Sequence, residues 1–223
     1  MNLPPLLSLF GEALFDTDRD RALQLVRDAI HQGAAAEELI FEVVIPALEK
    51  CVTDLEECEE LNLAQHFLTS QIAADVTEEL LPRFRVAPET VGRVVIGSPH
   101  GDLHTLGKRI VVGCLRPRMI ECADLGVNVS AERFVEEAEN RRASVIAISA
   151  MMVHTARSEK GCLKVREILR ERGLEDRIKV IIGGAPFRFD DQLHQRVGAD
   201  GWAPDGIQAV KVISRLIREA RPW

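Results

Sequence analysis

The segment best suited to chemistry is GDLHTLG, residues 101–107, which places an aspartate and a histidine two residues apart. It follows the apolar run RVVIG and a Gly-Ser-Pro turn, so both side chains stand at the end of an expected strand. A histidine that binds a metal commonly donates its second ring N–H to a carboxylate, which fixes the tautomer and makes the ligating nitrogen more basic. Asp102 can be that carboxylate for His104, and the hydroxyl of Thr155 could extend the relay.

A single histidine ligand leaves most coordination positions of a metal unfilled, so the metal would have to arrive inside a macrocycle that supplies the other donors. Glycines would suit such a ligand because they leave the backbone open to a bulky group. His100 stands on the other side of Asp102 and is an alternative ligand, whereas we expect His154 to be a loop residue. The glycines near the expected edge are Gly101, Gly107, Gly183 and Gly184.

Other chemistries at this position would need residues that the sequence lacks. The segment 97–101 does not complete the GxGxxG pattern of a dinucleotide site, and 101–108 has neither the spacing nor the final hydroxyl residue of a P-loop. Ser149 stands where a receiver domain would carry its phosphoacceptor aspartate. A Ser-His-Asp triad would be expected with a G-x-S-x-G elbow, and that motif does not occur.

The pattern of apolar residues, which predicts the elements that position these side chains, changes near Pro88. Residues 1–88 show helical periodicity, which predicts a helical bundle, and Pro46 should kink or restart one of its helices. Strand-like and helix-like runs alternate over 89–223, which predicts an α/β domain with a five-stranded, parallel, doubly wound sheet of flavodoxin-like or Rossmann-like type. Ligands of such sheets bind outside the carboxyl ends of the strands, so the candidate loops should meet at one edge.

Composition narrows the class of partner. The chain has 28 basic and 35 acidic residues and a net charge of −7, which argues against nucleic acid. No run approaches the ~20 apolar residues of a membrane span, and the apolar N-terminus lacks the basic region of a signal peptide. The odd number of cysteines without a CxxC pair suggests neither a disulfide framework nor a zinc site, so we expect a cytoplasmic protein. The cysteines are Cys51, Cys58, Cys114, Cys122 and Cys162.

Three motifs together resemble the cobalamin-binding domains. GDLHTLG matches their DxHxxG signature, SAM at 149–151 stands where the family has Ser-x-Leu, and GGAP at 183–186 supplies its glycine pair. The resemblance extends over about 90–215. The preceding segment LNLAQHFLTSQIAAD is similar to the helical cap of corrinoid proteins in methyltransferase systems and of methionine synthase.

The resemblance implies a role for each matching residue. His104 would be the lower axial ligand of cobalt, Asp102 would orient it, and Thr155 would stand at the relay hydroxyl position. Leu63 would be a cap leucine over the upper face of the cofactor. The other cofactor-binding positions carried over from the family are Gly107, Ser149, Met151 (in place of the usual leucine), Gly183 and Gly184.

The function implied by the resemblance is that of a corrinoid methyl carrier, which has no catalytic residue of its own and does not turn over substrate alone. A substrate:corrinoid methyltransferase would load the methyl group, and a second methyltransferase would pass it to tetrahydrofolate or a thiol. A reductive activator protein could be a third partner. Two alternatives share the fold: a cobalamin-binding subunit of an adenosylcobalamin-dependent mutase, which would not need the N-terminal helices, and a cobalamin-based sensor or regulator, which would need an output domain.

Overall fold

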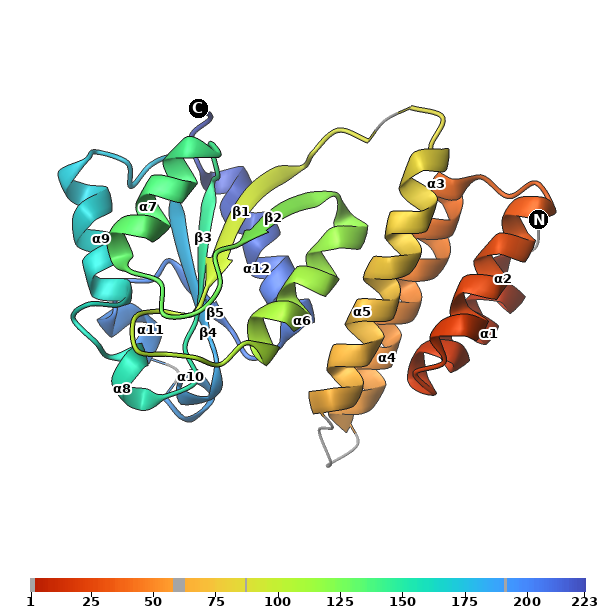
Figure 1. Ribbon diagram of the computed structural model, residues 1–223, viewed down its shortest axis with the longest axis horizontal. Coiled ribbons are helices and arrows are strands. Elements are labelled where there is room, and N and C mark those ends of the chain that lie inside the picture. Colours follow the sequence, from red (N-terminus) through yellow and green to blue (C-terminus); the bar gives the residue numbers. More distant parts are fainter. Residues whose placement is uncertain (1–2, 58–62, 87, 191) are drawn as a thin grey trace. The chain divides into compact units, whose positions relative to one another are not determined.

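The computed structural model of the chain divides into two compact units, coloured along the sequence in Figure 1. The first unit comprises Met1–Glu89 with Gly113–Met119, and the second comprises Thr90–Val112 with Ile120–Trp223. The structure describes residues 3–57, 63–86, 88–190 and 192–223, so Cys58 lies outside the described residues.

The first unit contains the predicted N-terminal helical region. The longer helices bury apolar residues against one another, including Phe10, Leu14, Val26 and Leu48. Asp18 caps the second of these helices by accepting a hydrogen bond from the backbone N–H of Arg21 at 3.0 Å. The elements are α1 (Leu3–Phe15), α2 (Arg19–His31), α3 (Ala36–Leu39), η1 (Ile40–Val44), α4 (Ile45–Glu57), α5 (Leu63–Leu80) and η2 (Leu81–Arg83).

The helical segment that contains Pro46 is not broken. Pro46 is the second residue of α4, and the turn before it, η1 (Ile40–Val44), is π-helical. Proline has no N–H to donate to the preceding turn, and a wider turn is one way in which a continuous helix can accommodate that loss. The proline therefore changes the type of helix at this point.

The second unit is built on a five-stranded sheet in the order β2-β1-β3-β4-β5, with every neighbouring pair parallel. The predicted fold class is confirmed. The register places Gly97 opposite Ile148 and Ser149 opposite Gly183, so three strands end side by side and their following loops emerge at the same edge. The strands are β1 (Gly92–Gly97), β2 (Ile120–Asp124), β3 (Val145–Ser149), β4 (Lys179–Gly183) and β5 (Gly201–Ala203).

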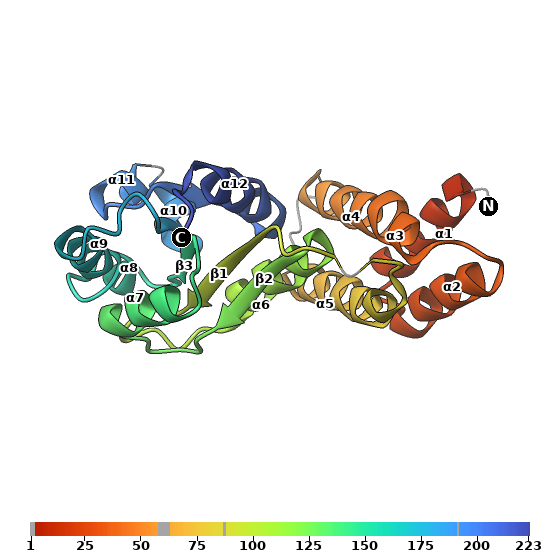
Figure 2. The same ribbon diagram turned by 90° about the horizontal axis from the view of Figure 1, so that it is seen from above.

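Helices cover both faces of this sheet, and Figure 2 shows α7 and α12 on opposite sides of the strands. The core under α7 and α9 is made of buried side chains from alternate strand positions, such as Ile146, Ile148, Val180 and Ile182. No helix in the described part of the chain is both long and apolar enough to cross a membrane. The helices of this unit are most of α6 (Leu106–Leu115), α7 (Ala131–Asn140), α8 (Val153–Ala156), α9 (Cys162–Glu171), α10 (Ala185–Phe189), α11 (Leu193–Arg196) and α12 (Gly206–Glu219), whereas the end of α6 and η3 (Arg116–Arg118) belong to the first unit.

The four described cysteines take part in no disulfide among the described residues. Burial raises the pKa of the Cys122 thiol and of the Cys162 thiol to about 12, so both are protonated at neutral pH and are poor nucleophiles. The described residues also contain no group of three or more His, Cys, Asp or Glu side chains placed to hold a metal ion.

The close approach of α7 to β1 generates a first prediction. A Cβ atom at Gly97 would lie 3.0 Å from the Phe134 ring and 3.1 Å from Val129. We expect Gly97→Ala to lower the free energy of unfolding by about 1–3 kcal/mol because the core is overpacked. Adding Phe134→Leu should recover part of this loss, so that the double variant costs less than the sum of the single variants by about 0.5–3 kcal/mol.

Urea denaturation of the four proteins of this cycle measures the coupling between the two positions. Gly11→Ala is the control, since a Cβ at Gly11 in α1 would meet nothing within 4 Å. That helical glycine replacement should stabilise by about 0.5–1 kcal/mol. Strict additivity of Gly97→Ala and Phe134→Leu would contradict the packing argument.

Candidate functional site

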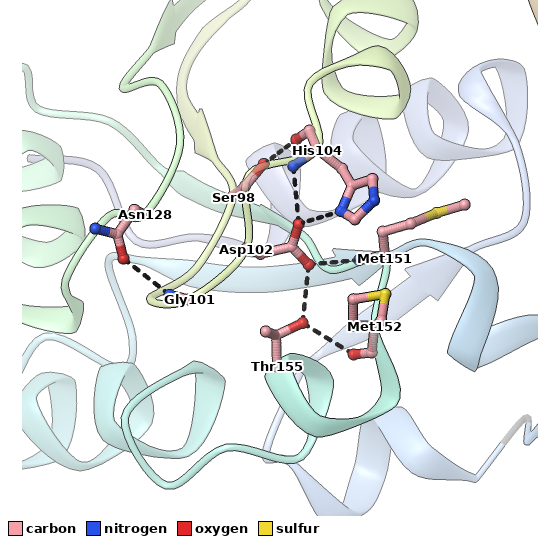
Figure 3. Close-up of polar contacts among 8 residues, drawn as sticks. All are labelled: Ser98, Gly101, Asp102, His104, Asn128, Met151, Met152 and Thr155. Atoms are coloured by element: carbon pink, nitrogen blue, oxygen red, sulfur yellow. Dashed lines mark hydrogen bonds and ion pairs between the residues drawn. The ribbon is translucent and has the colours of Figure 1, made fainter.

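A buried carboxylate organises the loop that follows β1. Asp102 is only 1% exposed, and its two oxygens accept hydrogen bonds from three residues on two loops. Oδ1 accepts the backbone N–H of His104 at 3.0 Å and lies 2.8 Å from Nδ1 of the same histidine. Oδ2 accepts the backbone N–H of Met151 and the hydroxyl of Thr155, each at 2.8 Å, as Figure 3 shows. Every contact made by this carboxylate is therefore with a hydrogen-bond donor.

The ionisation state of Asp102 follows from these contacts. Burial alone would raise its pKa, but the hydrogen bonds from His104, Met151 and Thr155 outweigh burial and hold the pKa at about 2. The group is thus a carboxylate at neutral pH and can only accept hydrogen bonds. Nδ1 of His104 must then carry the hydrogen that faces Oδ1, which leaves the lone pair of the neutral ring on Nε2.

His104 presents that second nitrogen outward. Its side chain is 55% exposed, and no described residue forms a hydrogen bond with Nε2. A neutral imidazole with a fixed Nδ1–H and an accessible Nε2 lone pair is the form that ligates a metal. The pair therefore has the geometry and the exposure that a single histidine ligand requires.

Thr155 links the histidine loop to the loop after β3. Its side chain is buried, and its hydroxyl oxygen lies 2.8 Å from Oδ2 of Asp102 and 2.9 Å from the carbonyl oxygen of Met152. A hydroxyl has one hydrogen to donate, and the charged carboxylate is the stronger acceptor. Thr155 thus stabilises the charge of Asp102 and ends the relay that begins at His104.

The glycine pair after β4 lies at the same edge. Gly183 accepts a hydrogen bond from the backbone N–H of Ala150 at 2.9 Å, and Gly184 has a φ of +124°. A Cβ atom at Gly184 would lie 2.0 Å from the carbonyl oxygen of Ala150, so no other residue fits without moving the backbone. The two loops approach each other this closely only because position 184 has no side chain.

Three further predicted residues lie around the same loops. Ser149 ends β3, and a Cβ at Gly107 in α6 would lie 3.4 Å from its hydroxyl oxygen, so the start of α6 packs near the end of β3. Met151 is 42% exposed, although its backbone N–H is bonded to Asp102. The structure therefore brings Gly107, Ser149 and Met151 to the edge that carries His104.

The remaining candidates are not among the residues that donate to Asp102. Leu63 is the first residue of α5 in the helical unit and has an exposed side chain, so its role as a cap leucine stays a prediction. His100 and His154 are exposed, and neither forms a hydrogen bond with Asp102 among the described residues. Asp102 therefore orients His104 and not the alternative ligand.

Two residues of the site are absent from the sequence-based prediction. Ser98 is fully buried and donates its hydroxyl to the carbonyl oxygen of His104 at 2.5 Å. The side-chain oxygen of Asn128, in the loop after β2, accepts the backbone N–H of Gly101 at 2.8 Å. The sequence signal for Asn128 is only that asparagine tolerates the left-handed conformation of a turn, which says nothing about its distant partner.

The surroundings of His104 suit a large, flat and mostly apolar group. Exposed apolar side chains on the two loops that meet at Asp102 include Leu103, which is 70% exposed, and Val153, which is 53% exposed. Met151 and Met152 add flexible, polarisable surface at the same place. The residues present fit a macrocycle with a central metal, for which Nε2 of His104 would be a donor and these apolar side chains would be contact surface.

Comparison with protein families identifies the second unit. The family model of the B12 binding domain matches residues 92–211. The chain belongs to the B12-binding domain family. The match spans the five strands and the loops described above, so the recognised family and its corrinoid cofactor are those predicted from the sequence.

Relatives of this B12-binding protein are corrinoid proteins. The dimethylamine corrinoid protein of Methanosarcina barkeri is 33% identical over 155 residues, which cover 70% of this chain and 69% of the relative. A corrinoid protein of Desulfitobacterium hafniense strain Y51 is 26% identical over 216 residues, or 95% of this chain and 97% of the relative. The likeness thus extends through both units.

Solved structures share the fold. A cobalamin-binding protein from Desulfitobacterium hafniense DCB-2 superposes with a TM-score of 0.77 at 24% identity, covering 94% of this chain and 98% of that one. A chain of the methanol:cobalamin methyltransferase complex from Methanosarcina barkeri gives a TM-score of 0.73 at 22% identity, covering 98% and 82%. At such identities the likeness is one of fold.

The depressed pKa of Asp102 makes the stability of the cofactor-free B12-binding protein depend on pH. A carboxyl whose pKa falls from about 3.9 unfolded to about 2 folded contributes about 2 kcal/mol above pH 4, and this is lost as the pH falls through 2. In Asp102→Asn an amide group replaces one of the acceptor oxygens and leaves buried donors unpaired. We expect this variant to be less stable at pH 7 by about 1–3 kcal/mol.

The difference between wild type and Asp102→Asn should shrink by about 2 kcal/mol between pH 7 and pH 2, because only the wild-type side chain titrates. Urea unfolding followed by circular dichroism at several pH values measures this difference. A difference that stays constant across the range would contradict the assignment of the low pKa to Asp102.

Proposed function

We propose that this chain is a corrinoid methyl carrier that binds its cofactor with His104 as the lower axial ligand. The observation that carries the proposal is the hydrogen bond between Nδ1 of His104 and the buried carboxylate of Asp102, 2.8 Å long, at the carboxyl edge of the sheet. In the neutral ring this bond places the lone pair on Nε2, which can then act as a donor to a metal. The name of the dimethylamine corrinoid protein, which is 33% identical, supports the same class of function.

The chain's own residues would hold and tune the cofactor. Asp102 fixes the tautomer of His104, and its negative charge makes Nε2 a stronger donor, while Thr155 limits that effect by sharing the charge. The bound corrinoid supplies the cobalt chemistry of methyl transfer. We assign Gly107, Ser149, Met151, Gly183 and Gly184 to the surroundings of the cofactor and its nucleotide tail.

The predicted partners are two methyltransferases. A substrate-specific methyltransferase would deliver the methyl group, as the names of related methylamine corrinoid proteins and of the methanol:cobalamin methyltransferase complex suggest. A second methyltransferase would pass it to tetrahydrofolate or a thiol, and a reductive activator protein would restore oxidised cofactor. In this scheme residues 1–88 form a cap for the upper face of the corrinoid, to which Leu63 contributes.

The carrier is favoured over a mutase subunit by the extent of the likeness. A trimethylamine corrinoid protein of Methanosarcina acetivorans is 29% identical over 213 residues, which cover 92% of both chains. The shared length includes the N-terminal helices, for which a mutase subunit would have no use.

Reconstitution with hydroxocobalamin tests the axial ligand. We expect the purified protein to retain a corrin after desalting, and its reduced form to show an electron paramagnetic resonance splitting from a histidine nitrogen. Nitrogen-isotope-labelled histidine should alter this splitting, which separates His104 from the cofactor's own base. His104→Ala should lose the splitting, and Asp102→Ala should weaken binding about 10–100-fold.

His100→Ala and His154→Ala are matched controls, because both remove an exposed histidine from the same loops. Each should retain cobalamin and the labelled splitting. The proposed ligand would be refuted if the wild type failed to retain cobalamin. It would also be refuted if the splitting from labelled histidine survived in His104→Ala.

A further inference from the structure

Asn128 makes two hydrogen bonds to the segment that carries Asp102. Its backbone N–H donates to the carbonyl oxygen of Asp102 at 2.9 Å, and its side-chain oxygen accepts the backbone N–H of Gly101 at 2.8 Å. Figure 3 shows the side chain of Asn128 directed at Gly101 from the neighbouring loop. One residue of the β2–α7 loop therefore fixes the main chain on both sides of the Asp102 Cα atom.

The backbone of Asn128 adopts a costly conformation in order to make these contacts. Its φ is +52°, in the left-handed region, where asparagine is among the better tolerated residues after glycine. Such a conformation persists only where surrounding contacts determine it, and it is enriched at functional sites. The same conformation turns both the N–H and the side-chain oxygen toward residues 101 and 102.

The rest of this loop pairs with the histidine loop as well. The backbone N–H of Val129 donates to the carbonyl oxygen of Ser98 at 2.9 Å, and the N–H of Ser98 donates to the carbonyl oxygen of Gly126 at 3.0 Å. Ser98 in turn donates its hydroxyl to the carbonyl oxygen of His104. The β2–α7 loop thus supports the histidine loop at its beginning, through Ser98, and at its centre, through Asn128.

This loop is itself held to the start of α6. The buried Lys108 donates to Asp124 at the end of β2, with 2.6 Å between Nζ and Oδ1. Oδ1 of Asp124 also accepts the backbone N–H of Gly126 at 2.9 Å. Because these bonds anchor the β2 end of the loop next to the segment it supports, they oppose a shift of Asn128 relative to Asp102.

We propose that Asn128 is a positioning residue for the axial histidine: it holds the Asp102 segment so that His104 keeps its Nδ1–H tautomer and its outward Nε2. This inference deepens the proposed function and rests on His104 being the ligand. Outer-shell partners of a metal ligand affect metal affinity by about 10–100-fold, and Asn128 acts one layer further out. We therefore expect an effect of about tenfold.

The test compares substitutions that separate the side-chain bond from the backbone conformation. Asn128→Gly keeps the left-handed backbone and its N–H but removes the oxygen that Gly101 contacts. Asn128→Asp keeps an acceptor oxygen at the same place and should rescue binding. Arg142→Gly is the matched control, because Arg142 is exposed, has a φ of +51° and precedes β3 at the opposite edge of the sheet.

Two readouts are taken on the full chain. Nitrogen NMR of the cofactor-free protein reports the tautomer of His104, and hydroxocobalamin titration reports affinity. We expect Asn128→Gly to raise the Nε2–H tautomer and to weaken binding about tenfold. Asn128→Asp and Arg142→Gly should match the wild type in both readouts. Thermal unfolding midpoints are measured alongside. A variant that is only less stable would show a lower midpoint but keep the wild-type tautomer of His104 while it is folded.

If Asn128→Gly has the same His104 tautomer and the same cobalamin affinity as the wild type, the inference is overturned, even if His104 is the ligand. If the wild-type protein shows no histidine-derived splitting, the proposed function is refuted instead. The effect of Asn128 on the His104 tautomer can still be measured in that case, because the measurement uses the cofactor-free protein. If Asn128→Gly does not fold, Asn128→His replaces it, since histidine tolerates the left-handed region but lacks the amide oxygen. The same tautomer shift is expected, and its absence overturns the inference.

Discussion

The site depends on burying a carboxylate without losing its charge. An unpaired ionised carboxylate in a protein interior would be neutralised or expelled, and Asp102 avoids both because each of its oxygens accepts two hydrogen bonds. Those donors come from His104 and from the loop after β3. The two loops can provide them together only if β1 and β3 are adjacent and parallel, which is the arrangement at the centre of this sheet.

The need to bring these loops close together also explains the positions of two glycines. Gly183 accepts the backbone N–H of Ala150, and a Cβ at the next position, 184, would stand 2.0 Å from the carbonyl oxygen of Ala150. Gly97 allows the Phe134 ring to pack over the end of β1. Glycines at strand ends thus let the layers close around the carboxylate, while the apolar strand interiors supply the stability.

Much of this arrangement can be predicted from the sequence, because continuous apolar runs such as RVVIG and SVIAISA alternate with helical periodicity and indicate a buried parallel sheet. The fold then places Asp102, Thr155 and Gly183 at one edge. The contact of Asn128 with Gly101 could not be predicted, because a tolerance for left-handed backbone identifies a turn but not a partner 27 residues away. Likewise, Pro46 indicates a disturbed helix, and its surroundings decide that the disturbance is a π-helical turn.

Half of the donors to Asp102 are main-chain amides, those of His104 and Met151. Main-chain groups are present whatever side chain the gene encodes, so the anchoring of the carboxylate at position 151 survives any substitution there except proline. The exposed side chains of Met151 and Met152 therefore take no part in holding the carboxylate in place. The apolar surface beside His104 can thus change with the side chains at positions 151 and 152 while the hydrogen bonds that hold the histidine remain.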